Sequence, residues 1–196
     1  MSGATNPESP LESSADEPWL NVPNSLSALR LVLTFVAAGL VSLGAYLPAF
    51  GVFVVAALTD AADGAIARAL NQTTRLGRQL DPLIDKIMVI VLLVHLLPVF
   101  RSAWFPWFVT LVVTREILVQ ALRGAVEGRG VAFGARWSGK LKTLLQCLAL
   151  GAILITLAYP SVAGLGLSRD VLLWGTAVVT AYSGGEYLLA AIRLLG

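Results

Sequence analysis

Apolar residues occur along the chain in six long runs, and short polar segments separate them. The length of each run is close to the about 20 residues that an α-helix needs to cross the hydrocarbon core of a bilayer. We place the expected membrane-spanning helices at 26–46, 48–70, 82–99, 104–122, 137–159 and 171–195. The pattern therefore predicts an all-α fold, a polytopic membrane protein with six transmembrane helices.

Composition supports this class. Of 196 residues, 57% are hydrophobic and only 13% are charged, and the mean hydropathy of +0.78 is far above that of a soluble domain. The chain has room for about six spans and little else. The single cysteine, Cys147, excludes an internal disulfide and any metal site that needs several cysteines.

The first residues differ from the rest of the chain. Residues 1–18 are acidic and rich in Ser and Pro, without the basic flank and apolar centre of a signal peptide. We expect a disordered tail of unassigned function there. Residues 19–25 carry a Trp, two Asn and a Pro next to an apolar run, which is typical of an interfacial segment. The membrane domain should therefore cover residues 19–196.

Positive charge is distributed unevenly among the connections between runs. The connection between the second and third runs and the one between the fourth and fifth carry most of it, whereas the opposite side has only Arg101 and Arg169. The residues on the richer side are Arg68, Arg75, Arg78, Lys86, Arg123, Arg129, Arg136, Lys140 and Lys142. Since Lys and Arg mark the cytoplasmic side, we expect both termini to face the cytoplasm of a cell membrane.

Four aspartates lie at or beside the ends of the second and third apolar runs: Asp60, Asp63, Asp81 and Asp85. A carboxylate at mid-membrane costs about 2.5–3.5 kcal/mol on insertion scales, so a positive partner is expected. Residues three or four apart share a helix face, and a short hairpin would bring the two pairs together. Oxygen ligands of this kind suit Mg²⁺, Mn²⁺ or Ca²⁺. Without a nearby His or Cys, zinc is not expected.

Small and basic residues accompany these aspartates. Gly64, Ala67 and Gly77 would leave an open wall for a ligand, and Arg68 would meet phosphate oxygens. Together they suggest a nucleotide or pyrophosphate bound through two metal ions, which would stabilise an in-line displacement. The alternative is that the aspartates only form ion pairs with nearby Arg and Lys side chains. Four carboxylates at this spacing, beside glycines, favour the metal site.

The whole stretch fits the pattern D-x2-D-G-x2-A-R-x8-G-x3-D-x3-D at every fixed position from Asp60 to Asp85. It resembles the signature of the CDP-alcohol phosphatidyltransferase family. The resemblance implies a six-helix membrane enzyme that transfers a phosphatidyl group from CDP-diacylglycerol to an alcohol and releases CMP. It also allows a homodimer. By the resemblance, Asp60, Asp63, Asp81 and Asp85 would hold Mg²⁺ or Mn²⁺, Asp85 would also be the catalytic base, and Asp63, Gly64, Ala67, Arg68 and Gly77 would bind CDP.

Residues outside this motif must select the acceptor alcohol. Arg115 and Glu116 lie inside the fourth run, and Lys140 and Lys142 lie at the start of the fifth. Arg115, Lys140 and Lys142 could together hold a phosphate monoester, although the lysines could also be cytoplasmic-side anchors. These segments and the entry 21–30 resemble the motifs R-E-I, G-K-x-K-T and N-x-P-N-x-L-T-x-x-R of the phosphatidylglycerophosphate synthase branch. That resemblance implies sn-glycerol 3-phosphate as the acceptor.

The sequence is also compatible with two other functions. A cardiolipin synthase of the same family, with phosphatidylglycerol as acceptor, has a similar entry and signature. A cation or proton transporter could use the aspartates as a relay, but its carboxylates should be spread through the bilayer depth. Of the remaining polar residues, we expect His95 to be a satisfied core or interface residue, and we leave Glu186 unassigned. The metal, the acyl-chain preference and the oligomeric state are also open.

Overall fold

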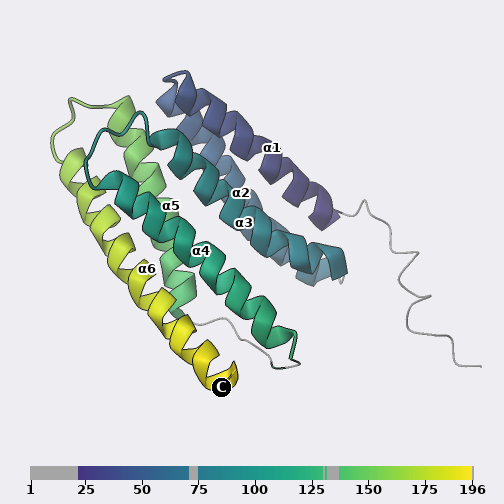
Figure 1. The fold of residues 1–196 in the computed structure, drawn as a ribbon. Helices are drawn as coiled ribbons and strands as arrows, with labels where there is room; N and C mark the ends of the chain where they lie inside the picture. The colour runs from purple at the N-terminus through teal and green to yellow at the C-terminus, as the bar shows by residue number, and fades with distance from the viewer. Residues whose placement is uncertain (1–21, 71–74, 130, 132–136, 196) are drawn as a thin grey trace, which may run out of the picture.

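The computed structural model describes residues 22–70, 75–129, 131 and 137–195 of the 196-residue chain (Figure 1). At 22–24, 60–70, 75–82, 85 and 195 it describes the helical backbone only. The predicted tail at 1–18 and the first part of the predicted interfacial segment lie outside the described residues, so both stay predictions.

The described residues form six α-helices, as the six apolar runs predict. They are α1 (Val22–Ser42), α2 (Tyr46–Leu70), α3 (Arg75–Leu96), α4 (Phe105–Glu127), α5 (Trp137–Ala158) and α6 (Leu165–Leu195). Glycines in the left-handed conformation occur in two of the connections, Gly44 with φ 75° before α2 and Gly164 with φ 87° before α6. A residue without Cβ adopts such angles without steric cost.

Three helix starts differ from the predicted spans by four residues or more. Helix α1 begins at Val22, inside the expected interfacial segment, and α6 begins at Leu165 rather than at 171. Helix α3 begins at Arg75 rather than at 82. The predicted spans rest on apolar residues only. The hydrogen bonds of a helix join backbone groups, so a helix can continue beyond the apolar run. In α3 the residues before the run, such as Arg75 and Gln79, also have good helix propensity.

The helices pack as two groups of three that join into one bundle (Figure 1). Helix α1 packs against α2 and α3, and α6 packs against α4 and α5. Contacts of α2 with α5, and of α3 with α4 and α5, connect the groups. Helix α3, which carries two of the motif aspartates, therefore adjoins α4 and α5, which carry the candidate acceptor residues.

Packing between the helices is apolar in the part of the bundle away from the charged residues. Buried side chains from all six helices form one hydrophobic cluster, with fully buried members such as Val41, Leu92, Phe105 and Ile153. A Cβ built on Gly151 of α5 would lie 3.2 Å from Cε2 of Phe50 on α2. The absence of a side chain at Gly151 therefore allows α2 and α5 to approach closely, as small residues do in membrane helix pairs.

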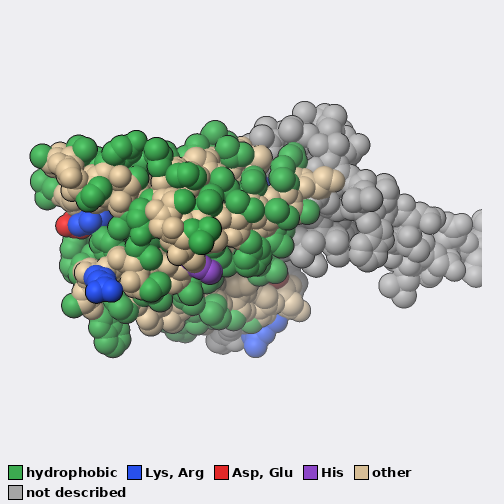
Figure 2. Space-filling view, turned by 90° about the horizontal axis from the view of Figure 1, so that it is seen from above, with side chains coloured by type: hydrophobic (Ala, Val, Ile, Leu, Met, Phe, Trp, Pro, Cys, Tyr) green, Lys and Arg blue, Asp and Glu red, His purple; other side chains and the backbone are tan. Residues whose placement is uncertain are grey.

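The outer surface is also apolar. Large hydrophobic side chains are exposed along several helices, among them Phe35, Trp107, Val178 and Ile192, and Figure 2 shows hydrophobic side chains over most of the visible described surface. By length and composition, three helical segments within the described residues could cross a membrane: Ser25–Ser42, Phe105–Glu127 and Trp137–Ala158. A soluble protein rarely exposes such continuous apolar area. The apolar helices thus indicate a multi-pass membrane protein.

Candidate functional site

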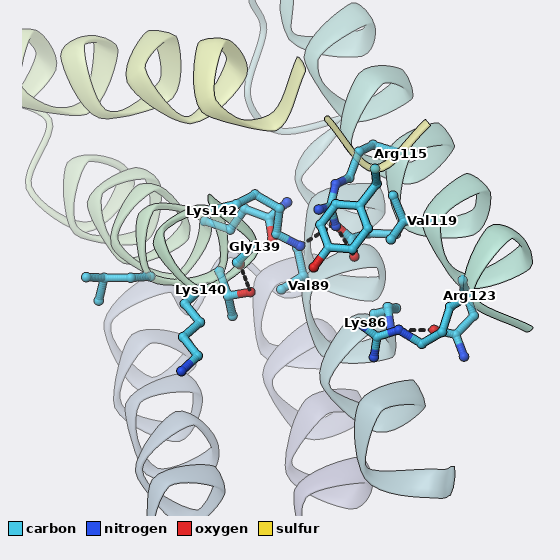
Figure 3. Close-up of a pocket in the computed structure, with 14 residues that line it drawn as sticks. Lys86, Val89, Arg115, Val119, Arg123, Gly139, Lys140 and Lys142 are labelled. Carbon is cyan, nitrogen blue, oxygen red and sulfur yellow. Dashed lines mark hydrogen bonds and ion pairs between the residues drawn. The ribbon is translucent and has the colours of Figure 1, made fainter. Parts of the chain in front are cut away.

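A cavity of about 480 Å³, lined by both charged and apolar residues, opens between α3, α4, α5 and α6 (Figure 3). Among the residues whose side chains the structure describes, five cations and one carboxylate line it, together with two glutamines and a tyrosine. The charged members are Lys86, Arg115, Glu116, Arg123, Lys140 and Lys142. Such an excess of positive charge at a cavity within apolar helices is costly unless it serves an anionic ligand.

Glu116 joins the two most deeply placed cations of this cavity. The Lys142 ammonium donates a hydrogen bond to Oε1 of Glu116, and Nη1 of Arg115 lies 3.4 Å from both carboxylate oxygens. The three residues are only 4%, 2% and 6% exposed for Lys142, Glu116 and Arg115. One carboxylate therefore balances two buried cations, and the cluster retains one net positive charge.

Helix α6 holds Arg115 from the other side. Nη2 of Arg115 donates to Oγ of Ser183 at 2.5 Å, and the guanidinium lies 5.4 Å from the ring centroid of Tyr187. A Cβ on Gly184 would lie 3.2 Å from Cγ of Arg115. The hydroxyl, the aromatic face and the missing side chain together fix the position of the guanidinium.

A second cationic region lies where α3 meets α4. Nζ of Lys86 donates to Oε1 of Gln120 at 2.8 Å, and Figure 3 shows Lys86 next to Arg123. Among the described residues, Nε of Arg123 is buried without a hydrogen-bond partner. This end of the cavity adjoins the motif, because Lys86 directly follows Asp85 in the chain.

The motif residues lie on α2 and α3. The sequence predicts Gly77 in the connection before the third span, whereas it is in α3. Asp60, Asp63, Gly64, Ala67 and Arg68 are in the C-terminal part of α2, and Gly77, Asp81 and Asp85 are in α3. Their side chains lie outside the part of the chain whose side chains the structure describes. The metal cage and the CDP site therefore stay predictions. Within the described side chains, no group of three or more His, Cys, Asp or Glu could hold a metal ion.

The three candidate acceptor residues line the same cavity, but they are not equivalent. Arg115 and Lys142 share the Glu116 carboxylate. Lys140 is exposed and in Figure 3 extends away from that pair. The sequence pointed to three cations of similar role, whereas the structure places two in the interior and one at the rim.

The sequence pattern does not indicate several polar residues of this region as site residues. Ser183 and Tyr187 on α6 contact Arg115, and Gln120 on α4 and Gln146 on α5 line the cavity. A pattern could have found some of them. Ser138, Lys142 and Gln146 recur every four residues in an apolar run and so share one face of α5.

The structure also gives surroundings for the two remaining polar residues. Oε2 of Glu186 accepts a hydrogen bond from Oγ of Ser138 at 2.5 Å, which ties α6 to the start of α5. Nδ1 of His95 lies 2.8 Å from the carbonyl oxygen of Val91. His95 is therefore a satisfied interface residue, as the sequence analysis expected.

The support of Arg115 by α6 leads to a stability prediction. Ser183→Ala removes the acceptor of Nη2 and leaves a buried guanidinium N–H unpaired, which costs about 1–3 kcal/mol. We expect a lower melting temperature for the purified variant in detergent. Ser168→Ala is the matched control, because the Ser168 hydroxyl is exposed and bonds only to a backbone carbonyl. Equal melting temperatures for the two variants would contradict the proposed support.

A family model for CDP-alcohol phosphatidyltransferases matches residues 20–182. The chain belongs to the CDP-alcohol phosphatidyltransferase family. The match includes the aspartate motif on α2 and α3 and the cavity residues on α3, α4 and α5.

Relatives within the CDP-alcohol phosphatidyltransferase family are similar over most of their length. A protein of Sodalis glossinidius named CDP-diacylglycerol–glycerol-3-phosphate 3-phosphatidyltransferase is 38% identical over 88% of this chain and 95% of its own. One of the same name from Pectobacterium atrosepticum is 39% identical over 87% and 94%. A Mycobacterium tuberculosis protein named probable phosphatidylglycerophosphate synthase is 34% identical over 90% and 84%.

CDP-alcohol phosphatidyltransferases use divalent metals. The residue types of the motif fit such an ion by their chemistry, because four carboxylates could supply hard oxygen donors from two helices. Carboxylate oxygens without a neighbouring Cys or His favour Mg²⁺ or Mn²⁺ over zinc.

Proposed function

We propose that this protein is an enzyme that transfers the phosphatidyl group of CDP-diacylglycerol to sn-glycerol 3-phosphate. The products are phosphatidylglycerophosphate and CMP, and the reaction belongs to phospholipid biosynthesis. Family membership supports the phosphatidyl transfer, and the names of the relatives support the acceptor.

The observation that carries the choice of acceptor is the buried pair of cations in the α3–α6 cavity. Arg115 and Lys142 share one carboxylate, so the cluster has a net positive charge in the absence of ligand. A phosphate monoester supplies the missing negative charge, and Arg and Lys bind its oxygens through charge-assisted hydrogen bonds. Lys140 at the rim would attract the anion toward the cavity. A neutral alcohol would leave the positive charge of the cluster without a counter-charge.

Asp60, Asp63, Asp81 and Asp85 would hold two Mg²⁺ or Mn²⁺ ions, and Asp63, Gly64, Ala67, Arg68 and Gly77 would bind the CDP group. When bound, the metal ions neutralise charge that develops on the transferring phosphate in an in-line displacement. Arg68 would contact a phosphate oxygen. The small residues would allow the nucleotide to approach the helix backbone closely.

Asp85 would act as the general base. The carboxylate takes the proton of the C1 hydroxyl of glycerol 3-phosphate while that oxygen forms a bond to the β-phosphorus, the one bonded to diacylglycerol. The bond from this phosphorus to the oxygen that bridges to CMP breaks, and CMP leaves with the electron pair. Lys86 follows Asp85 directly and lines the cavity, so the acceptor cavity and the base share one stretch of α3.

The enzyme would span a cell membrane six times with its site and both termini on the cytoplasmic side. The uneven distribution of Lys and Arg supports this orientation. The six helices and their exposed apolar side chains support the number of spans. A homodimer stays a prediction.

CMP release tests the proposal. Purified protein receives CDP-diacylglycerol and Mg²⁺ or Mn²⁺ with glycerol 3-phosphate, phosphatidylglycerol or inositol phosphate as acceptor. We expect release with glycerol 3-phosphate, and its loss with EDTA. Release only with phosphatidylglycerol would identify a cardiolipin synthase instead. No release with any acceptor would contradict phosphatidyl transfer and favour a transporter.

Lys142→Ala should weaken the use of glycerol 3-phosphate more than that of CDP-diacylglycerol. Loss of a charge-assisted hydrogen bond in a buried site costs about 1.5–3 kcal/mol, which raises the KM for glycerol 3-phosphate about 10- to 100-fold. The KM for CDP-diacylglycerol should change little. Lys140→Ala is the matched control and should have a smaller effect, because Lys140 is exposed and its charge is screened. A change confined to the lipid substrate would remove Lys142 from the acceptor site.

A further inference from the structure

Gln146 is a buried polar residue of the cavity that has no role in the mechanism above. It lies on α5, is 2% exposed and lines the cavity. Its amide nitrogen Nε2 is buried and has no hydrogen-bond partner among the described residues. An amide donor in this state is costly in any protein interior, and more so between membrane-spanning helices.

The other members of the same helix face differ from Gln146 in this respect. Ser138, Lys142 and Gln146 are spaced four residues apart and are all buried on α5. Ser138 donates to Glu186 and Lys142 donates to Glu116. Within this described face only the Gln146 donor lacks a protein partner, and Gln146 lines the cavity together with Lys142.

We propose that Gln146 recognises the C2 hydroxyl of sn-glycerol 3-phosphate and thereby determines acceptor specificity. This inference rests on the proposed function. The charged groups Arg115 and Lys142 suit the phosphate, whereas a neutral amide suits a neutral hydroxyl. The amide offers both a donor and an acceptor, and a hydroxyl needs one of each. Rotation about the broad terminal torsion of Gln can turn either amide atom to the ligand.

The spacing along α5 fits one small acceptor. Gln146 lies one turn beyond Lys142, and a turn of α-helix rises about 5.4 Å. A three-carbon phosphate is of this size, so its phosphate can contact Lys142 while a carbon-bound oxygen contacts Gln146. The C1 hydroxyl then remains for the base and the C2 hydroxyl for the amide.

The test removes the hydroxyl and the amide separately. The acceptors are sn-glycerol 3-phosphate and 3-hydroxypropyl phosphate, which keeps the phosphate and the nucleophilic hydroxyl but lacks the one at C2. The variant is Gln146→Met, because Met keeps the length of the side chain and removes both polar atoms. We compare kcat/KM for both acceptors in the wild type and the variant, measured as CMP release.

We expect the wild type to prefer glycerol 3-phosphate by about 10- to 100-fold, since loss of the hydroxyl leaves a buried amide unpaired. In Gln146→Met this preference should fall by about tenfold or more, because kcat/KM for glycerol 3-phosphate decreases. If the preference is unchanged while both activities fall equally, Gln146 does not recognise the hydroxyl. If the wild type releases no CMP with glycerol 3-phosphate at all, the proposed function itself fails, and this inference fails with it.

Gln120→Met is the matched control. It removes another amide of the same cavity, but one whose oxygen already accepts from Lys86. Its preference between the acceptors should remain that of the wild type, and loss of preference there would overturn the assignment to Gln146.

Thermal unfolding without substrate gives a second measurement. Because Gln146→Met removes an unpaired buried donor, we expect a melting temperature equal to or above that of the wild type. A lower melting temperature would indicate a structural glutamine and would overturn the proposal.

Discussion

Asp85→Asn is expected to lower kcat about 10²- to 10⁴-fold, the contribution typical of a general base. The amide has nearly the same size as the carboxylate, but it cannot accept the proton of the acceptor hydroxyl. The measurement is CMP release at saturating CDP-diacylglycerol and glycerol 3-phosphate. Wild-type turnover in this variant would contradict the role of Asp85 as the base.

Metal-dependent binding of CDP-diacylglycerol should distinguish the role of Asp85 as the base from the role of the other motif aspartates. Asp85→Asn leaves Asp60, Asp63 and Asp81 as carboxylates, so metal-dependent binding of CDP-diacylglycerol should be partly retained. Asp60→Asn should instead weaken that binding and raise the metal concentration needed for it. Titration of Mg²⁺ at fixed CDP-diacylglycerol measures the difference, and identical titrations for the two variants would contradict separate roles.

Asp170→Asn is the control for the chemical change itself. Asp170 is at the start of α6, where its carboxylate pairs with Arg169 and its side chain is 47% exposed. A partly exposed ion pair contributes little to stability. We expect near wild-type turnover, so that a loss in Asp85→Asn reports on its position rather than on the loss of any carboxylate.

The fold could be predicted because a membrane helix requires a long apolar run, and each of the six runs contains most of one helix. The starts of α3 and α6 could not be predicted in this way. Residues such as Arg75 and Arg169 lie in these helices outside the apolar runs, and the hydrogen bonds that continue a helix do not depend on apolar side chains.

The sequence predicts a candidate site where the chemistry is local, but it does not predict contacts that depend on helix packing. Four aspartates at helical spacing indicate a metal site, and Arg115 and Lys142 indicate an anion site. That Glu116 balances both cations depends on the packing of α4 against α5. The support of Arg115 by Ser183 likewise depends on α6, 68 residues away. Hydropathy and spacing contain no information about these contacts.

Glu116→Ala is expected to have the largest effect on stability. Removing one partner of a buried ion pair costs about 3–5 kcal/mol, because the remaining charge is left buried without compensation. Here two cations lose their common carboxylate. We expect a strongly lowered melting temperature in detergent. Glu127→Ala is the matched control on the same helix, since Glu127 is exposed, and equal destabilisation by both variants would contradict the prediction.

Glu116→Gln separates charge from hydrogen bonding. The amide oxygen of Gln can still accept from Lys142, but the negative charge is absent. If charge balance contributes most to stability, the melting temperature of Glu116→Gln should be closer to that of Glu116→Ala than to that of the wild type. If hydrogen bonding dominates, it should lie close to the wild type.

Glycerol 3-phosphate should restore part of the stability that Glu116→Ala loses. A ligand that binds only the folded protein stabilises it by RT ln(1 + [L]/Kd), about 2.7 kcal/mol at 100 times Kd. Without Glu116 the cavity has one more net positive charge, so its affinity for a phosphate dianion should rise. The rise in melting temperature with glycerol 3-phosphate should therefore be larger for Glu116→Ala than for the wild type, while glycerol should have no such effect. An equal rise in both proteins would mean that the phosphate binds away from Arg115 and Lys142.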